Sequence, residues 1–155
     1  MTVRRFQPSD AEQLSAIVCR NLIEVNSRDY PLEEMQALAS SYHAEKILQM
    51  ASNAHTYVVC EENRIVGTGS ISSFWGSETE SILLTIFVLP EYHGKGFGKK
   101  IIEALERDEL FLRASRIEIP ASITACRFYE KMGYHYKNNT KTLDEEGLYR
   151  MEKFR

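Results

Sequence analysis

Three glycines in five positions, Gly94, Gly96 and Gly98, follow an apolar stretch and precede residues with helical spacing. Glycines at the start of a helix leave backbone N–H groups uncovered, and these donors, together with the helix dipole, bind anions such as phosphate. The pattern predicts a site for a phosphorylated ligand; the alternative is a tight structural turn, since glycine adopts positive φ in any loop. The dinucleotide fingerprint G-x-G-x-x-G fails because Lys99 or Ile101 stands where its third glycine is needed, and no G-K-[ST] run provides a P-loop.

Two segments, in this order, resemble the GNAT superfamily of acyl-CoA-dependent N-acyltransferases. The spacing His93-x-x-Gly96-x-Gly98 is similar to the family's [RQ]-x-x-G-x-[GA] motif, which holds the pyrophosphate of coenzyme A. The segment 121–134, ASITACRFYEKMGY, resembles the family's N-x-x-A-x-x-F-Y-x-K-x-G-F motif. Histidine replaces the usual Arg or Gln at position 93, and Ser122 replaces the usual Asn. Neither replacement removes a backbone donor from the turn.

The resemblance implies acetyl-CoA as the cofactor and attack on its thioester by the amine nitrogen of an unidentified small molecule or peptide. It also implies that a backbone N–H around Ile86 to Val88 polarises the thioester carbonyl, and that Tyr129 protonates the departing thiolate. For Tyr129, packing beside Phe128 is the alternative. The residues implied to bind the cofactor are Ile86, Phe87, Val88, His93, Gly94, Lys95, Gly96, Phe97, Gly98, Lys99, Ser122, Ala125, Phe128 and Tyr129.

A general base is harder to assign. Glu80 stands at the start of the central strand, close to where some members of the resembled family carry a carboxylate, although Ile82 aligns better with that position. Glu78, His43 and His55 are further candidates, and ordered water is the alternative to any side chain. Cys126 has no partner base within its motif, so we expect direct transfer through a ternary complex without a covalent acyl-enzyme.

The resemblance assigns recognition of the acceptor amine to the segment 24–35 and to the loop 137–147. Within and beside these segments, Tyr30, Glu33 and Trp75 are predicted to bind the substrate, and acidic groups there would attract a cationic amine. No metal is expected, because the three cysteines are widely spaced and form no C-x-x-C pair. A non-catalytic acyl-CoA-binding sensor and a small nucleotide-binding module are the alternative functions.

The elements that must position these residues follow from hydrophobic spacing and turn signals. The residues from 82 to 89 are nearly all apolar, which predicts a strand buried on both faces. We predict a mixed α/β fold with a single twisted, mostly antiparallel mixed sheet of about six to seven strands flanked by about four helices. The expected order is strand 3–7, a helix to about 26, one broken helix or two short ones to about 51, a hairpin 55–71, strand 80–89, a helix after 98, strand 116–119, a helix after 122, and strands 134–136 and 148–152.

Composition limits the remaining possibilities. The 155 residues predict one domain over 1–155, and 19 basic against 22 acidic residues give a net charge of −3, so no nucleic-acid partner is expected. The apolar run 82–89 is too short to cross a membrane, and residues 1–7 lack the apolar core of a signal peptide. We therefore expect a cytoplasmic protein without a membrane partner. The resemblance alone suggests a homodimer.

Overall fold

A β-hairpin forms the second and third strands of the sheet. Strands β2 (His55–Glu61) and β3 (Arg64–Ser73) are rich in β-branched residues and are joined by the two-residue turn Glu62-Asn63. Both turn residues have positive φ, 49° and 67°, which matches the right-handed twist of the flanking strands. The predicted hairpin is confirmed.

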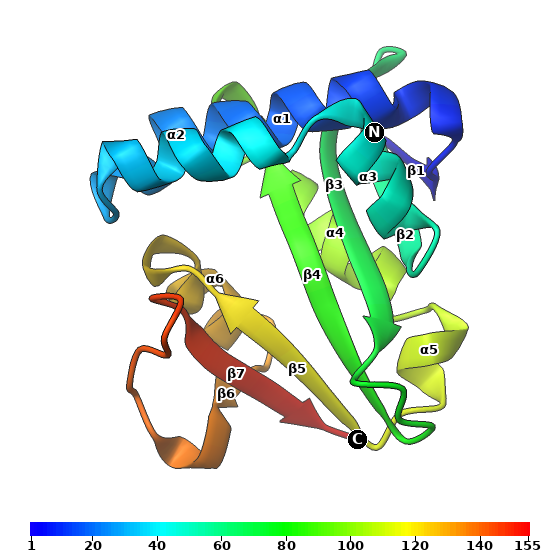
Figure 1. Ribbon diagram of the computed structural model, residues 1–155. Helices are drawn as coiled ribbons and strands as arrows, with labels where there is room; N and C mark the ends of the chain where they lie inside the picture. The colour runs from blue at the N-terminus through cyan, green and yellow to red at the C-terminus, as the bar shows by residue number, and fades with distance from the viewer.

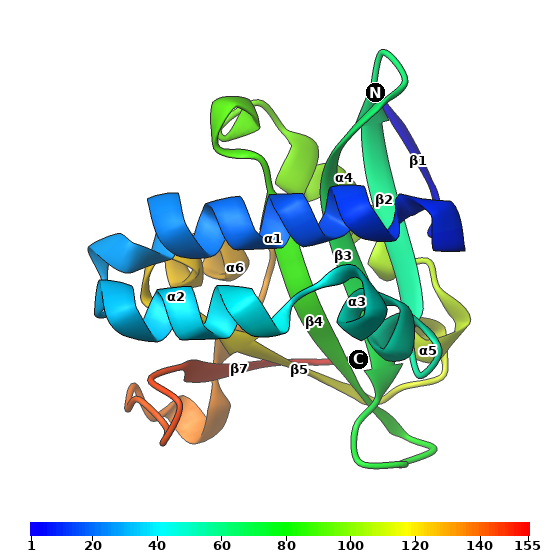
Figure 2. The same cartoon turned by 45° about the horizontal axis from the view of Figure 1, so that its top comes forward.

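The computed structural model describes all residues 1–155 as one seven-stranded sheet with helices on both faces (Figures 1 and 2). The sheet order is β1-β2-β3-β4-β5-β7-β6, and every neighbouring pair is antiparallel except β4 and β5. The other strands are β1 (Thr2–Arg5), β4 (Glu80–Val88), β5 (Arg116–Ala121), β6 (His135–Tyr136) and β7 (Tyr149–Phe154). The helices are α1 (Ala11–Glu24), α2 (Leu32–Ser41), α3 (Ala44–Ala51), α4 (Phe97–Leu105), α5 (Glu109–Leu112) and α6 (Cys126–Lys131).

The predicted mixed, mostly antiparallel sheet is therefore confirmed, with seven strands. The number of helices is six rather than about four. One reason is that His43 caps a new helix, its Nδ1 accepting the Lys46 N–H, so that α2 and α3 are separate. A second is the one-turn helix α5, which the carboxylate of Asp108 caps at the Leu110 N–H. No helix is both long enough and apolar enough to cross a membrane.

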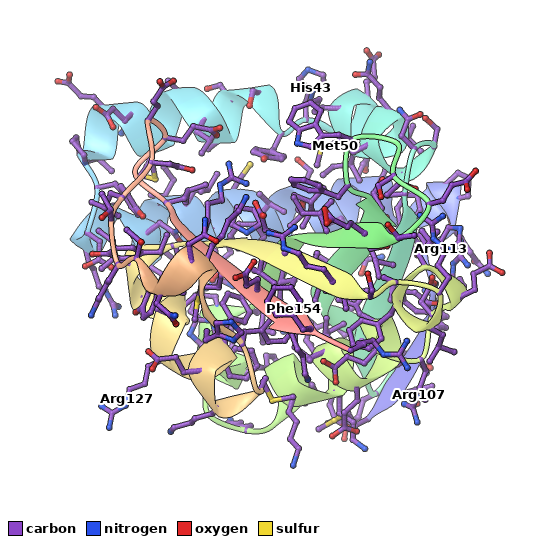
Figure 3. All side chains as sticks on the ribbon, turned by 90° about the horizontal axis from the view of Figure 1, so that it is seen from below. His43, Met50, Arg107, Arg113, Arg127 and Phe154 are labelled. Carbon is purple, nitrogen blue, oxygen red and sulfur yellow. The ribbon has the colours of Figure 1, made fainter.

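The core lies on both faces of the sheet. Helix α1 crosses one face of β2, β3 and β4, and α4 lies behind the opposite face (Figure 2). The buried stripes of the two helices, Leu14 and Val18 on α1 and Ile101 and Leu105 on α4, are at most 2% exposed. Seen from below, α2 and α3, near the labelled His43 and Met50, lie on the side of the sheet opposite Arg127 of α6 and Arg107, which follows α4 (Figure 3).

Strands β4 and β5 separate soon after they meet. Their parallel pairing covers only Glu80–Ile82 against Arg116–Glu118, after which the strands diverge (Figure 1). The rest of β4 therefore has no strand neighbour on that side, and residues 84–87 are half-buried rather than enclosed on both faces. The expectation of a strand buried on both faces is wrong for this half of β4, because the neighbour that would cover it has turned away.

A β-bulge marks the open half of β4. Between the pairs Thr68–Phe87 and Ser70–Leu84, the single residue Gly69 faces both Thr85 and Ile86. Thr85 has a φ of 53°, a rare conformation for a β-branched residue. Gly69 is needed here, because a Cβ built on it would lie 2.5 Å from Cγ2 of Ile101 on α4. The absence of a side chain at position 69 therefore lets α4 pack closely against the sheet beside the bulge.

Candidate functional site

The glycine-rich turn leaves its backbone donors free. No backbone N–H from Gly94 to Lys99 bonds to any group of the protein; the first bonded N–H is that of Lys100, to the Gly96 carbonyl at 3.1 Å. Gly94 and Gly96 have φ of 74° and 88°, and a Cβ on either would meet nothing within 4 Å. The turn is thus an open cradle of consecutive donors at the start of α4, a geometry that binds anions.

Positive side chains surround this cradle. Lys95, Lys99 and Lys100 are exposed, and none takes part in an ion pair. Phe97 is 4% exposed and stacks edge-on against Tyr92, with ring centroids 5.2 Å apart. The buried ring anchors the helix start while the donors and lysines stay in solvent, so a phosphorylated ligand can approach without displacing protein contacts.

His93 ties the turn to the strand before it. Its Nε2 donates to the Val88 carbonyl at 2.7 Å, so this nitrogen carries a proton and is engaged. Only Nδ1 is left for a ligand. Val88 itself is 8% exposed and contributes this carbonyl rather than a side chain that lines the cavity described below.

The two motifs found in the sequence touch one another. A Cβ on Gly98 would lie 3.2 Å from Cζ of Phe128, so the absence of a side chain lets α6 approach the start of α4. Ser122 and Ala125 precede α6, with the Ala125 N–H donating to the Ser122 carbonyl at 3.0 Å. The structure thus brings the glycine turn and the second motif to one place beside the open half of β4.

A cavity of about 550 Å³ occupies the opening between β4 and β5 and extends under α2. Fifteen of its 24 lining residues are hydrophobic. Strand β4 contributes residues 82–87, including Ile86 and Phe87, and the β5–α6 side contributes Ser122 and Tyr129. The remaining wall comes from α1, α2, β7 and the loops beside them, and includes Leu22, Tyr30, Glu34, Met35, Leu38, Tyr42, Phe74, Trp75, Glu146, Leu148 and Arg150.

Tyr129 is a buried titratable residue in the lining of this cavity. It is 5% exposed, and no group of the protein hydrogen-bonds to its hydroxyl. Burial raises the pKa of Tyr129 far above its usual value, with the nearby Cys126 thiol adding to the effect. The phenol is therefore protonated at neutral pH, and its free hydroxyl is able to donate a proton or a hydrogen bond to a molecule in the cavity.

The predicted substrate residues occupy different positions. Tyr30 lines the cavity, but its hydroxyl is held by protein: it donates to the Gly147 carbonyl at 2.6 Å and accepts the Ile123 N–H at 3.2 Å. Trp75 lies at the rim and is 92% exposed. Glu33 does not line the cavity, whereas its neighbour Glu34 does.

Glu80 lies at the closed end of the opening, away from the cavity. It is at the first paired position of β4 and β5, and its Oε1 accepts from Arg116 Nη1 at 3.3 Å. His43 and His55 are also outside the cavity, and His55 is bound to Asp108 at 3.0 Å. The cavity's own carboxylates, Glu34 and Glu146, are both on its outer, exposed side.

Cys126 is packed beside Tyr129 and does not line the cavity. The thiol is 5% exposed and donates to the Ser122 carbonyl at 3.4 Å. Burial raises the pKa of this thiol, which keeps it protonated. The geometry therefore gives no support to Cys126 as a nucleophile.

Leu38 and Tyr42, which line the cavity from α2 and its end, were not identified from the sequence as binding residues, whereas Glu34 lies within the segment 24–35 assigned to acceptor recognition. Glu34, Leu38 and Tyr42 follow Tyr30 at intervals of four residues, so all four can share one side of the helix axis. That spacing was the available signal. Arg150 was not identifiable in this way, because its place in the cavity depends on the pairing of β7 with β5.

Comparisons with known proteins agree with this geometry. The chain is 28% identical over 135 residues to the uncharacterised N-acetyltransferase YafP of Escherichia coli K12, covering 85% of this chain and 79% of YafP. It is 36% identical over 80 residues to an uncharacterised acetyltransferase of Streptococcus pyogenes serotype M1, about half of each chain.

Solved structures share the whole fold. A GCN5-related N-acetyltransferase from Rhodopseudomonas palustris has a TM-score of 0.81 at 23% identity, covering 99% of this chain and 95% of that one. The PaiA N-acetyltransferase of Thermoplasma acidophilum, solved with coenzyme A, has a TM-score of 0.83 at 17% identity over 99% and 98%. The sequence model of the acetyltransferase (GNAT) family matches residues 19–134. With three quarters of its length matched and the fold shared throughout, the chain belongs to the acetyltransferase (GNAT) family.

Proposed function

We propose that this protein is an acetyl-CoA-dependent N-acetyltransferase that transfers the acetyl group directly to an amine in a ternary complex. The observation that carries the proposal is the run of free N–H groups from Gly94 to Lys99, placed beside a cavity that contains the unbonded hydroxyl of Tyr129. One feature suits a pyrophosphate and the other suits a leaving group that needs a proton.

The residues present fit coenzyme A. The open cradle at Gly94 and Gly96 and the free cations of Lys95 and Lys99 would hold the pyrophosphate. The edge of β4 beyond Ile82 has no strand partner on the cavity side, so its backbone groups are available to the amides of the pantetheine arm. Bound acetyl-CoA supplies an acetyl thioester as the electrophile.

Tyr129 and water account for the proton transfers. An alkylammonium acceptor, with a pKa of about 10.4, first loses a proton to water. The amine nitrogen then forms a C–N bond with the acetyl carbon while the C–S bond breaks, and Tyr129 gives its phenolic proton to the departing sulfur. A second proton leaves the nitrogen and Tyr129 is reprotonated from solvent, so the products are an amide, free thiol and one net proton.

Water is the better candidate for the first acceptor of the amine proton. Glu80 is bonded to Arg116 and lies outside the cavity, and the two carboxylates that do line it are exposed. A covalent acyl-enzyme has no support, because the Cys126 thiol is buried, protonated and bonded to a carbonyl.

A ligand titration tests this proposal. A ligand present at 100 times its Kd stabilises a protein by about 2.7 kcal/mol, so acetyl-CoA and CoA should each raise the Tm clearly, and ATP and NAD should not. Thiol release from acetyl-CoA should then depend on an added amine. Stabilisation by ATP or NAD instead of CoA would contradict the proposal, and binding of CoA without thiol release for any amine would indicate a non-catalytic sensor.

A further inference from the structure

The outer part of the cavity, away from Tyr129, is rich in aromatic rings. Tyr30, Tyr42, Phe74 and Trp75 come from three separate segments of the chain and all line it. Trp75 is 92% exposed and has a φ of 50°, so the loop between β3 and β4 holds an indole in solvent in a strained conformation. A large exposed ring at the rim of a cavity is a contact surface for a bound molecule.

The one cation of the cavity is already neutralised. Arg150 Nε bonds to Asp144 at 2.9 Å, its Nη1 lies 3.4 Å from Glu118, and its Nη2 lies 3.9 Å from Glu146. Burial opposes ionisation of Glu118, but hydrogen bonds from Lys137 and Arg116 outweigh it and hold the pKa of Glu118 below its usual value. Arg150 therefore has no charge to spare for a carboxylate or phosphate on a substrate.

The ion-pair cluster beneath this wall is negative as a whole. It links five carboxylates to three permanently charged bases, which leaves a net charge of minus two. The carboxylates are Glu80, Glu118, Asp144, Glu146 and Glu152, and the bases are Arg116, Lys137 and Arg150. Glu34, which also lines the cavity, has no ion pair and adds a further negative charge. The field at the cavity mouth attracts cations and repels anions.

These two properties together define an acceptor. Resting on the proposed function, we propose that the acceptor is an arylalkyl monoamine: a primary amine on a short chain that ends in an aromatic ring, with no carboxylate or phosphate. Its ammonium form is drawn in by the negative field, its ring packs against the aromatic wall, and its nitrogen reaches toward the hydroxyl of the buried Tyr129, which has no protein partner.

The same observations disfavour two other amine classes. An amino acid would bring a carboxylate to a wall whose only cation is bound to three carboxylates. A polyamine carries no ring to pack against the aromatic wall, and its inner ammonium groups would lie against a lining in which 15 of 24 residues are hydrophobic. The amino acid would therefore enter with an unpaired carboxylate, and the polyamine would leave the aromatic rings uncovered.

The chain contains a reporter for this test, because Trp75 is its only tryptophan and lies at the cavity rim. We expect 2-phenylethylamine, titrated into protein saturated with CoA, to give a saturable change in Trp75 fluorescence. Phenylalanine adds only a carboxylate to this probe, and 1,4-diaminobutane carries a 2-aminoethyl group, with a second ammonium, in place of the ring. Phenylalanine and 1,4-diaminobutane should each bind at least about tenfold more weakly than 2-phenylethylamine.

Two matched pairs of variants test the contacts. Leu38→Lys places a cation in the cavity lining and should weaken 2-phenylethylamine about tenfold, whereas Leu48→Lys, at a similarly exposed helix position outside the cavity, should not. Glu34→Gln should weaken it about threefold, and Glu12→Gln, also in the first turn of a helix and unpaired, should leave it unchanged.

The failures of the two proposals are distinguishable. An intact thermal shift with CoA, combined with no saturable fluorescence change for 2-phenylethylamine, overturns the acceptor class alone. Equal or tighter binding of phenylalanine or 1,4-diaminobutane does the same. A missing CoA shift overturns the proposed function itself.

Discussion

Replacing Tyr129 by Phe removes one oxygen atom, and the structure predicts that this change affects turnover rather than folding. The hydroxyl has no hydrogen-bond partner in the protein, so its loss leaves no donor or acceptor unpaired. If Tyr129 is the general acid, kcat falls on the order of 10²-fold, equivalent to about 2.7 kcal/mol of transition-state stabilisation. The KM for acetyl-CoA and the Tm should hardly change.

Tyr134→Phe is the matched control. Its ring is 2% exposed and lies 6.5 Å from that of Tyr129, but its hydroxyl donates to Glu106 at 3.0 Å. Glu106 keeps its contact with Lys153 at 2.9 Å, so losing the tyrosine hydroxyl should cost about 1.5 to 3 kcal/mol, the range for a hydrogen bond to a charged group. That corresponds to a fall in Tm of several degrees, with kcat unchanged.

The two variants should therefore differ: Tyr129→Phe should lower kcat, and Tyr134→Phe should lower stability. Thiol release from acetyl-CoA under saturating amine measures kcat, and urea unfolding measures stability. Near-normal turnover by Tyr129→Phe would assign this tyrosine to packing. An equal loss of turnover in both variants would also contradict the assignment of Tyr129 as the general acid, since it would trace the loss to the packing of the two rings.

Two further predictions concern stability. Gly69→Ala brings a Cβ to within 2.5 Å of Ile101 and should destabilise the fold by about 1 to 3 kcal/mol in urea unfolding; unchanged stability would mean that α4 shifts without cost. For Asp108, burial opposes ionisation, but hydrogen bonds from Tyr57, the Leu110 N–H and His55 outweigh it and lower its pKa. The unfolded state therefore binds a proton on this carboxylate at a higher pH than the folded state does. The stabilisation from ionised Asp108 is complete above about pH 4 and is lost as the pH falls through the folded-state pKa. Asp108→Asn should flatten the acid limb of stability against pH, and parallel curves would contradict this.

Much of the fold was predictable because local spacing and turn chemistry agree with the tertiary structure. The apolar stripe of α1, the hairpin turn at Glu62-Asn63 and the glycine run before α4 each act over a few residues. The break between α2 and α3 was not predictable in detail, because it rests on one histidine cap. The environment of β4 was misjudged for a different reason: an apolar run indicates a strand but does not indicate where the neighbouring strand departs.

The candidate site divides in the same way. The proposed phosphate site at the glycine turn consists of backbone N–H groups of consecutive residues, so a short motif describes it, and His93 and Ser122 replace the usual side chains without removing a donor. No short motif describes the proposed acceptor site in the outer part of the cavity, because its residues come from α2, the β3–β4 loop and β7 and meet only in the folded chain.

This difference has a consequence for how substrate preference can change. The outer part of the cavity, where we propose that the amine binds, uses none of the backbone donors of the glycine turn. A substitution such as Leu38→Lys should therefore alter the preferred amine while coenzyme A binding stays intact. A substitution in the glycine turn, by contrast, is not expected to affect coenzyme A binding alone. Gly98 contacts Phe128 next to Tyr129, so a larger side chain at position 98 should disturb both the cofactor turn and the placement of the acid. In the proposed mechanism, acceptor specificity can therefore change independently of cofactor binding, whereas cofactor binding and proton donation are coupled.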